Sequence, residues 1–144
     1  MDCRIDPSCE VKNFNEVDLD SGAIVTFTGN TRSQTKVGES IDYLVLERHP
    51  TLTLQSMQDI STTASNRFNV SGIRVIHRYG RIKPHETIVF VAVASAHRRE
   101  AFEAADYLMD RLKTDAVFWK REEGSFGSRW IDTTERDVLD RERW

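Results

Sequence analysis

Three cations follow directly after an apolar segment of the chain and could form an anion site. His97, Arg98 and Arg99 occupy the first turn of a helix that the sequence predicts. A helix N-terminus presents free N–H groups, and arginines beside them can hold a phosphate or a carboxylate. Cations in a first turn oppose the helix dipole by roughly 0.3–1 kcal/mol each, so the arrangement lowers local stability. The alternative is that these side chains are solvated, or pair with Glu100 and Glu103.

Two lysines at the other end of the same segment form a second candidate group. Lys113 ends the predicted helix, where a cation suits the helix dipole and is common without any function. Lys120 lies in a predicted strand beside Arg121, and alternation directs these two side chains to opposite faces. One of the two can therefore face inward, where a charged group is seldom kept unless it is paired or functional. A lysine in such a setting can have a lowered pKa and act as nucleophile or base.

Other signs of familiar chemistry are missing from the sequence. There is no G-x-S-x-G, GxGxxG, P-loop or HExxH pattern. His49, His77 and His85 are scattered, and we interpret them as surface or strand residues rather than metal ligands. Cys3 and Cys9 have a spacing that matches no common zinc or redox motif, so we interpret them as free thiols. The sequence thus predicts neither a metal nor a cofactor.

Length and composition favour one soluble domain spanning residues 1–144. The chain carries a net charge of −3, with 39% hydrophobic and 30% charged residues. This balance argues against nucleic-acid and membrane binding, although aromatic residues interleaved with basic ones leave single-stranded nucleic acid as a minor option. No apolar run approaches the ~20 residues of a membrane helix, and the N-terminus does not resemble a signal peptide. We therefore expect a cytoplasmic protein.

The elements that would position these residues alternate between strands and helices. Strands are expected at residues 22–29, 41–48, 72–80, 87–95 and 116–121, with a hairpin strand at 129–132. Amphipathic helices are expected at 54–68 and 96–113, the second with Ser95 as its N-cap. Residues 1–20 are expected to be an irregular lead-in, 30–40 a loop, 81–86 a turn and 133–144 a charged, helical tail. The order predicts an α+β domain with a mixed sheet, whose apolar strand 87–95 is central.

Three segments together resemble the large, catalytic subunit of molybdopterin synthase. They are GAIVTFTGNTR (22–32), VIHRYGRIKPHETIVFVAVASAHRREAFEAADYLMDRLKT (75–114) and AVFWKRE (116–122). The resemblance implies an α+β fold with a hammerhead-like β-subdomain and a homodimer. It also implies a small ubiquitin-like subunit on each end, giving a heterotetramer. The thiocarboxylated tail of that subunit would deliver sulfur twice to cyclic pyranopterin monophosphate, forming molybdopterin.

The resemblance also implies roles for particular residues. Lys113 matches the family's essential active-site lysine, and Lys120 matches a second one. The substrate pocket would be lined by the basic residues Arg32, His97 and Arg98. Phe27 and Met109 match the apolar walls of the family's pocket less closely. Arg32 alone would be an ordinary loop arginine unless the loop folds over an anion site. Where the family often has another basic residue, this chain has Thr133 and Thr134, with Arg136 beyond them.

The length of the predicted helix constrains how these residues can meet. Arg98 and Lys113 are fifteen residues apart, hence roughly 22 Å along the helix. If both serve one site, a second subunit must supply one of them, so we expect a dimer with shared active sites. Two alternatives remain from the sequence. One is a non-catalytic docking module for a ubiquitin-like tail, which would not need Lys113. The other is a sensor of phosphate ligands that uses His97 and Arg98.

Overall fold

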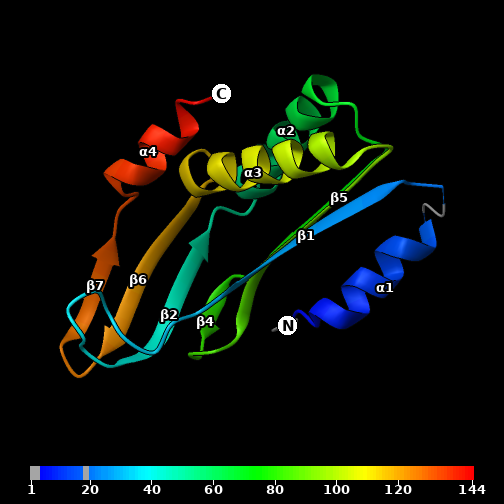
Figure 1. Cartoon of the computed structure of the whole chain (residues 1–144). Coiled ribbons are helices and arrows are strands. Elements are labelled where there is room, and N and C mark those ends of the chain that lie inside the picture. The colour runs from blue at the N-terminus through cyan, green and yellow to red at the C-terminus, as the bar shows by residue number, and fades with distance from the viewer. Residues whose placement is uncertain (1–3, 18–19) are drawn as a thin grey trace.

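The computed structural model describes residues 4–17 and 20–144 (Figure 1). The helices are α1 (Pro7–Val17), α2 (Leu52–Arg67), α3 (Arg98–Thr114) and α4 (Glu135–Arg141). The strands are β1 (Ala23–Asn30), β2 (Ile41–Arg48), β3 (Gly72–His77), β4 (Gly80–Ile82), β5 (Thr87–Ser95), β6 (Phe118–Gly124) and β7 (Gly127–Ile131). None of the helices in the described residues is long and apolar enough to cross a membrane.

The strands form two antiparallel sheets. One has the order β1-β5-β3, and the other, which is the β-subdomain, has the order β4-β2-β6-β7. Figure 1 shows the four-stranded sheet toward the opposite end of the molecule from α1. The predicted α+β class is confirmed, but two antiparallel sheets replace the predicted single mixed sheet.

The division into two sheets arises at residues 72–80, where one strand was predicted and the structure has two. β3 ends at His77 and β4 begins at Gly80, each in a different sheet. Between them the buried side chain of Arg78 forms an ion pair with Glu86 at 2.8 Å. Gly80 has a φ of +91°, a conformation that few other residues adopt readily, so the chain turns out of the first sheet there. The predicted turn at 81–86 consequently includes the last residues of β4.

Strand β5 is central to its sheet and covered on both faces, as predicted. The helices α2 and α3 cover one face, where Val89, Val91 and Val93 are fully or nearly buried. Helix α1 covers the other face, and its Phe14 packs against Phe90 in the same cluster. This central position makes β5 a rigid base for α3, which follows it directly.

Helix α1 corrects the expectation of an irregular lead-in at residues 1–20, as far as those residues are described. The carboxylate of Asp6 accepts hydrogen bonds from the backbone N–H of Ser8 (3.0 Å) and Cys9 (3.3 Å), which caps the helix start. Pro7 occupies the first helical position, where its missing N–H is harmless. Since Phe14 is the one buried residue of α1, the sequence carried little helical periodicity. Cys9 is a free, exposed thiol as predicted, and Cys3 lies outside the described residues.

Helix α3 starts two residues later than predicted, because Ser95 is not its cap. Ser95 is the last residue of β5, is 1% exposed and donates its hydroxyl to the carbonyl of Asn69 at 2.7 Å. His97 takes the N-cap position, and its side chain makes no capping hydrogen bond. The two cations that follow therefore stand at the open end of a helix whose N–H groups are unused by a side-chain cap.

Candidate active site

A pocket of about 200 Å³ lies where the C-terminal end of α3 meets β6, the end of β3 and the start of α4. We call it the lysine pocket. Its polar and charged lining includes His77, Lys113, Lys120, Asp132, Thr134 and Asp137. Both lysines singled out in the sequence therefore face one cavity.

Lys113 is held at the rim of the lysine pocket by an anion. Its Nζ lies 3.3 Å from Oδ1 of Asp137, and its side chain is 51% exposed. The other oxygen of Asp137 accepts hydrogen bonds from the backbone N–H (3.2 Å) and hydroxyl (2.6 Å) of Thr134, in the capping box of α4. Partial burial opposes ionisation of Asp137, but the bonds from Thr134 and the charge of Lys113 hold its pKa below the usual value. The carboxylate of Asp137 thus places a negative charge beside the Nζ of Lys113.

Lys120 has a different environment, although it shares the same pocket. Burial lowers its pKa, and the nearby charge of Lys113 adds to this effect, while Asp137 opposes it. Its neighbour Arg121 forms ion pairs with Glu47 and Glu123 instead. The expectation that one of these two basic residues faces inward is thus confirmed for Lys120.

His77 completes the lysine pocket, although we interpreted it from the sequence only as a surface or strand residue. It ends β3, and its ring stacks on Phe118 of β6 with centroids 4.2 Å apart and planes at 26°. Burial, mainly, and the charge of Lys120 lower its pKa from 6.5 to about 4, against the opposing effect of its hydrogen bond to the backbone of Arg78. The ring is therefore neutral near pH 7. Because β3 and β6 belong to different sheets, no local sequence pattern predicted that His77 would lie beside Phe118.

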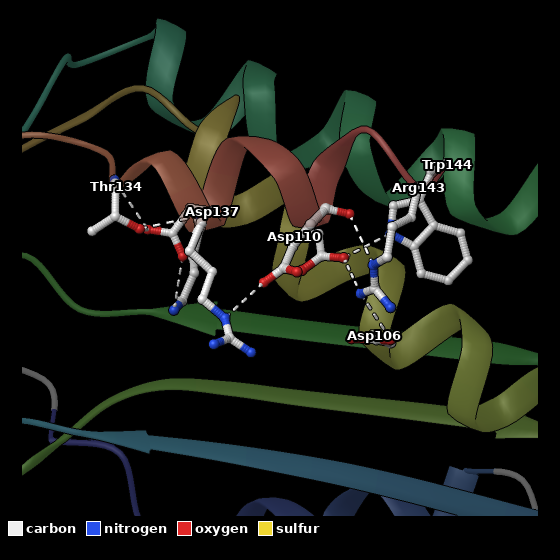
Figure 2. A network of polar contacts seen from close by, with 9 residues as sticks. Asp106, Asp110, Thr134, Asp137, Arg143 and Trp144 are labelled. Atoms are coloured by element: carbon white, nitrogen blue, oxygen red, sulfur yellow. Dashed lines mark hydrogen bonds and ion pairs between the residues drawn. The ribbon is translucent and has the colours of Figure 1, made fainter.

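The start of α4 contributes Thr134 and Asp137, which sequence reasoning also missed. A signal was present, since Thr134 and Asp137 have the spacing of a capping box. Figure 2 shows these two residues turned toward each other at the start of α4. Arg136, considered as a substitute for a basic residue of the family, is 89% exposed and lies near Asp140. The residue that reaches Lys113 from α4 is acidic rather than basic.

Helix α4 is fixed at its far end as well. The buried carboxylate of Asp110 on α3 accepts hydrogen bonds from Arg143 and from the indole of Trp144, each at 2.7 Å (Figure 2). The Trp144 ring also packs edge-on against Phe68 and Tyr107. These contacts hold α4 along α3, so that Asp137 stays over Lys113.

A larger hollow of about 680 Å³ surrounds the other end of α3. We call it the α3 N-terminal hollow, and its lining includes His97, Arg98, Arg99, Phe102 and Glu103. Arg99 lies 3.9 Å from Glu103, a pairing that matches the alternative considered from the sequence. His97 and Arg98 are exposed, and Phe102 is 61% exposed although it is aromatic. The hollow thus offers exposed cations and an apolar surface at the start of a helix.

The remaining predicted site residues lie in neither cavity. Arg32 is exposed in the loop after β1, and Phe27 is 41% exposed on β1 itself. Met109 packs partly buried against the core, one helical turn before Lys113. Arg98 and Lys113 stand at opposite ends of α3, which separates them by roughly 22 Å. One chain therefore divides the predicted site into two distant parts.

Comparison with known proteins points to one family. The family model described as "MoaE protein" matches residues 3–115. The chain is 43% identical over 143 residues to the molybdopterin synthase catalytic subunit of Caulobacter vibrioides, covering 99% of this chain and 93% of that protein. It is 45% identical over 125 residues to the same subunit of Escherichia coli, covering 87% and 83%. The solved molybdopterin cofactor biosynthesis protein E of Burkholderia multivorans superposes with a TM-score of 0.82 at 32% identity, covering 99% and 92%.

Proposed function

The chain belongs to the MoaE protein family, and from this premise we propose that it is the catalytic subunit of a molybdopterin synthase. It is a sulfurtransferase in molybdenum cofactor biosynthesis. Sulfur passes from the thiocarboxylated C-terminus of a small ubiquitin-like subunit to cyclic pyranopterin monophosphate and forms the dithiolene of molybdopterin. The observation that carries this assignment in the structure is the lysine pocket, which joins Lys113 and Lys120 in one cavity.

The two lysines suit a reaction between anions. The donor tail is a thiocarboxylate and the substrate carries a phosphate, so a site without cations would repel both. Lys113, which is paired with Asp137, can bind the incoming anion and stabilise charge that develops as sulfur attacks the substrate. We assign Lys113 the catalytic role. Lys120, deeper in the pocket, positions the tail and the substrate.

Each transfer leaves an acyl–sulfur bond that must be broken. Sulfur of the thiocarboxylate forms a bond to a carbon of the substrate while that carbon's bond to oxygen breaks and the oxygen leaves with the electron pair, as when the cyclic phosphate opens. The tail and the substrate become joined through that sulfur. Water then adds to the acyl carbon, the carbon–sulfur bond breaks, and the electron pair stays on the product sulfur. The tail leaves as a carboxylate, so both protons of the water must be taken up, one by the product sulfur and the other by a base. A lysine with a lowered pKa is a suitable acceptor for that proton.

The phosphate of the substrate needs a separate set of cations. We propose that His97 and Arg98 supply it from the second protomer of a homodimer, because one α3 cannot bring both of its ends to one ligand. The exposed Phe102 in the same hollow would then be covered at the protomer interface. Arg32, in an exposed loop, would join the phosphate site on assembly.

The apolar walls and the assembly follow from the same proposal. Met109 lies on the same side of α3 as Lys113, since four residues make about one turn, and would border the substrate. Phe27 would contribute a further wall. A small subunit on each end of the homodimer gives a heterotetramer, and "catalytic subunit" in the relatives' names implies such a partner. We place the reaction in the cytoplasm, where a reducing medium keeps thiocarboxylates and thiols such as Cys9 intact.

A reconstituted sulfur transfer tests this function. The purified chain is mixed with the thiocarboxylated small subunit and cyclic pyranopterin monophosphate, and molybdopterin is measured. Lys113→Ala is run in parallel with Lys12→Ala, which removes an exposed lysine of α1 far from the pocket in sequence. We expect full product formation from the wild type and from Lys12→Ala, and about 10²–10³-fold slower formation from Lys113→Ala. A folded wild type that binds the small subunit but makes no product would be a docking module instead.

A further inference from the structure

Helix α4 is attached to α3 by charged contacts rather than by a core of its own. None of the residues described in α4, Glu135–Arg141, is buried. At the end of α4, Arg141 lies 2.9 Å from Asp115, the C-cap residue of α3. At its start, the carboxylate of Asp137 lies 3.3 Å from Nζ of Lys113. Lys113 is therefore both a residue of the lysine pocket and a point at which α4 is attached.

The two oxygens of the Asp137 carboxylate serve different parts of the chain. Oδ2 accepts hydrogen bonds from the hydroxyl (2.6 Å) and the backbone N–H (3.2 Å) of Thr134, while Oδ1 faces Lys113 (Figure 2). The bonds from Thr134 belong to the capping box, so they fix the carboxylate relative to the first turn of α4. The side chain of Asp137 is 19% exposed and that of Lys113 is 51% exposed. The acid is thus the fixed member of the pair, and the lysine is the adjustable one.

The side chain of Lys113 has little else to hold it in place. It projects from the last turn of α3, and a flexible four-carbon stem samples many rotamers unless its amine is bound. Among residues 4–17 and 20–144, Asp137 is its one ion-pair partner. Helix α3 therefore determines where the side chain of Lys113 begins, and Asp137 determines where its amine lies.

The other charged groups that line the pocket do not offer Lys113 the same support. Lys120 on β6 is basic, so it cannot serve as a counter-ion. Asp132 is exposed in the segment before α4, and in the described part of the chain it forms no ion pair with Lys113. Loss of the Asp137 carboxylate would leave both lysines of the pocket without a paired anion.

We propose that Asp137 is a positioning residue for Lys113: the capping box of α4 fixes its carboxylate, and the carboxylate holds the amine of Lys113 at the rim of the lysine pocket. This inference rests on the proposed function and adds to it the element that places the catalytic group. The carboxylate comes from 24 residues further along the chain, so the first turn of α4 positions an amine that α3 carries. Asp137 acts through Lys113 and exchanges no proton with the substrate.

Two substitutions separate the charge of Asp137 from its part in the cap. Asp137→Asn has a single acceptor oxygen, and when this oxygen accepts from Thr134 the amide NH2 is left facing Lys113, so the cap is kept and the ion pair is lost. Asp137→Glu keeps the charge within the Thr-x-x-Glu pattern of a common capping box, so both contacts are kept. The matched control is Asp140→Asn, which removes the same charge from the same helix. Asp140 lies 3.8 Å from the exposed Arg136 instead.

Turnover by the enzyme assembled with its small subunit is the first readout. We expect Asp137→Asn to lower kcat about tenfold with little change in KM for the pterin substrate, because a misplaced catalytic amine slows the reaction more than it weakens binding. Asp137→Glu should recover most of that loss, and Asp140→Asn should match the wild type. Equal losses in Asp137→Asn and Asp137→Glu, or a wild-type kcat in Asp137→Asn, would overturn the inference.

The second readout does not depend on activity. The picosecond–nanosecond motion of the Lys113 side chain is measured by NMR relaxation in protein with isotope-labelled lysine, and its signal is assigned by its loss in Lys113→Arg. In the wild type it should be more ordered than the exposed Lys12, and this order should disappear in Asp137→Asn but not in Asp140→Asn.

The two readouts also separate this inference from the proposed function. A Lys113 side chain as mobile as that of Lys12 in the wild type would contradict the positioning role even in an active enzyme. Order that disappears in Asp137→Asn, in a wild type without sulfur-transfer activity, would support the positioning while the proposed function fails.

Discussion

The two ends of α3 carry cations in contrasting surroundings. At the C-terminal end, Lys113 and Lys120 line an enclosed pocket of about 200 Å³, with Asp137 and His77 as fixed partners. At the N-terminal end, His97 and Arg98 stand exposed around a hollow of about 680 Å³. Burial lowers the pKa values of Lys120 and His77 in the first group, whereas the second group presents charge to whatever docks there. The comparison suggests that one end performs proton and charge chemistry and the other end binds an anion.

The largest expected difference between the two ends is in their kinetic signature. Lys113→Ala should lower kcat by about 10²–10³-fold, because a charge at the pocket rim that stabilises the transition state is lost. Arg98→Ala should mainly raise KM for the pterin substrate, since it removes binding of a phosphate that is present before and after attack. Steady-state assays at varied substrate concentration measure both. A kcat defect in Arg98→Ala as large as that in Lys113→Ala would erase the distinction.

Mixed dimers show whether the two ends serve one site. In a dimer of Lys113→Ala with Arg98→Ala, one shared site carries both changes and the other carries neither. Random mixing at equal amounts should therefore restore about a quarter of wild-type activity, although each variant alone is weak. The assay is molybdopterin formation after co-refolding of the two variants. No recovery in a confirmed mixed dimer would mean that each site is built from one protomer.

The lysine pocket should also make the protein sensitive to acid. His77 has a pKa of about 4 when folded and about 6.5 when unfolded, so the unfolded chain binds a proton first as pH falls. Its contribution to stability is complete above pH 6.5 and disappears progressively toward pH 4. The free energy of unfolding should fall by roughly 2–3 kcal/mol over this range. Urea melts of wild type and His77→Asn measure it, and parallel curves for the two proteins would contradict the assignment.

The smallest expected effect concerns the cap that holds Asp137. Thr134→Ala removes the hydroxyl from the capping box of α4 and should destabilise the protein by about 1 kcal/mol. Thr134→Ser keeps the hydroxyl and is the matched control. If Asp137 then moves away from Lys113, activity should fall in Thr134→Ala but not in Thr134→Ser. Thermal melts and the sulfur-transfer assay together separate loss of stability from loss of positioning.

Local patterns predicted the parts of the fold that bury long apolar stretches. The nine residues of β5 and the stripe of α3 were evident because burial imposes periodicity on many residues at once. Helix α1 was missed because Phe14 is its one buried residue, which leaves little apolar periodicity. The break after His77 was missed because the ion pair between Arg78 and Glu86 joins residues of two predicted elements.

Part of the candidate site, like part of the fold, could be predicted from the sequence. Lys113 and Lys120 stood out through the resemblance to a family and, for Lys120, through strand alternation. His77 and Asp137 join them by contacts between elements that are far apart in the chain. Contacts of that kind leave no spacing rule in the sequence, so the partners that tune the lysines could be seen only in the folded structure.

The fixed length of α3 has a consequence for how this chain can change over evolution. Each residue added inside α3 would rotate everything after it by about 100° and advance it by about 1.5 Å. One insertion would therefore swing Lys113 out of its pocket and away from Asp137, while every side chain remained present. Substitutions on the exposed face of α3 should be widely tolerated, but insertions and deletions within it should be almost absent from functional variants. A deep mutational scan would show α3 as permissive in identity and strict in length.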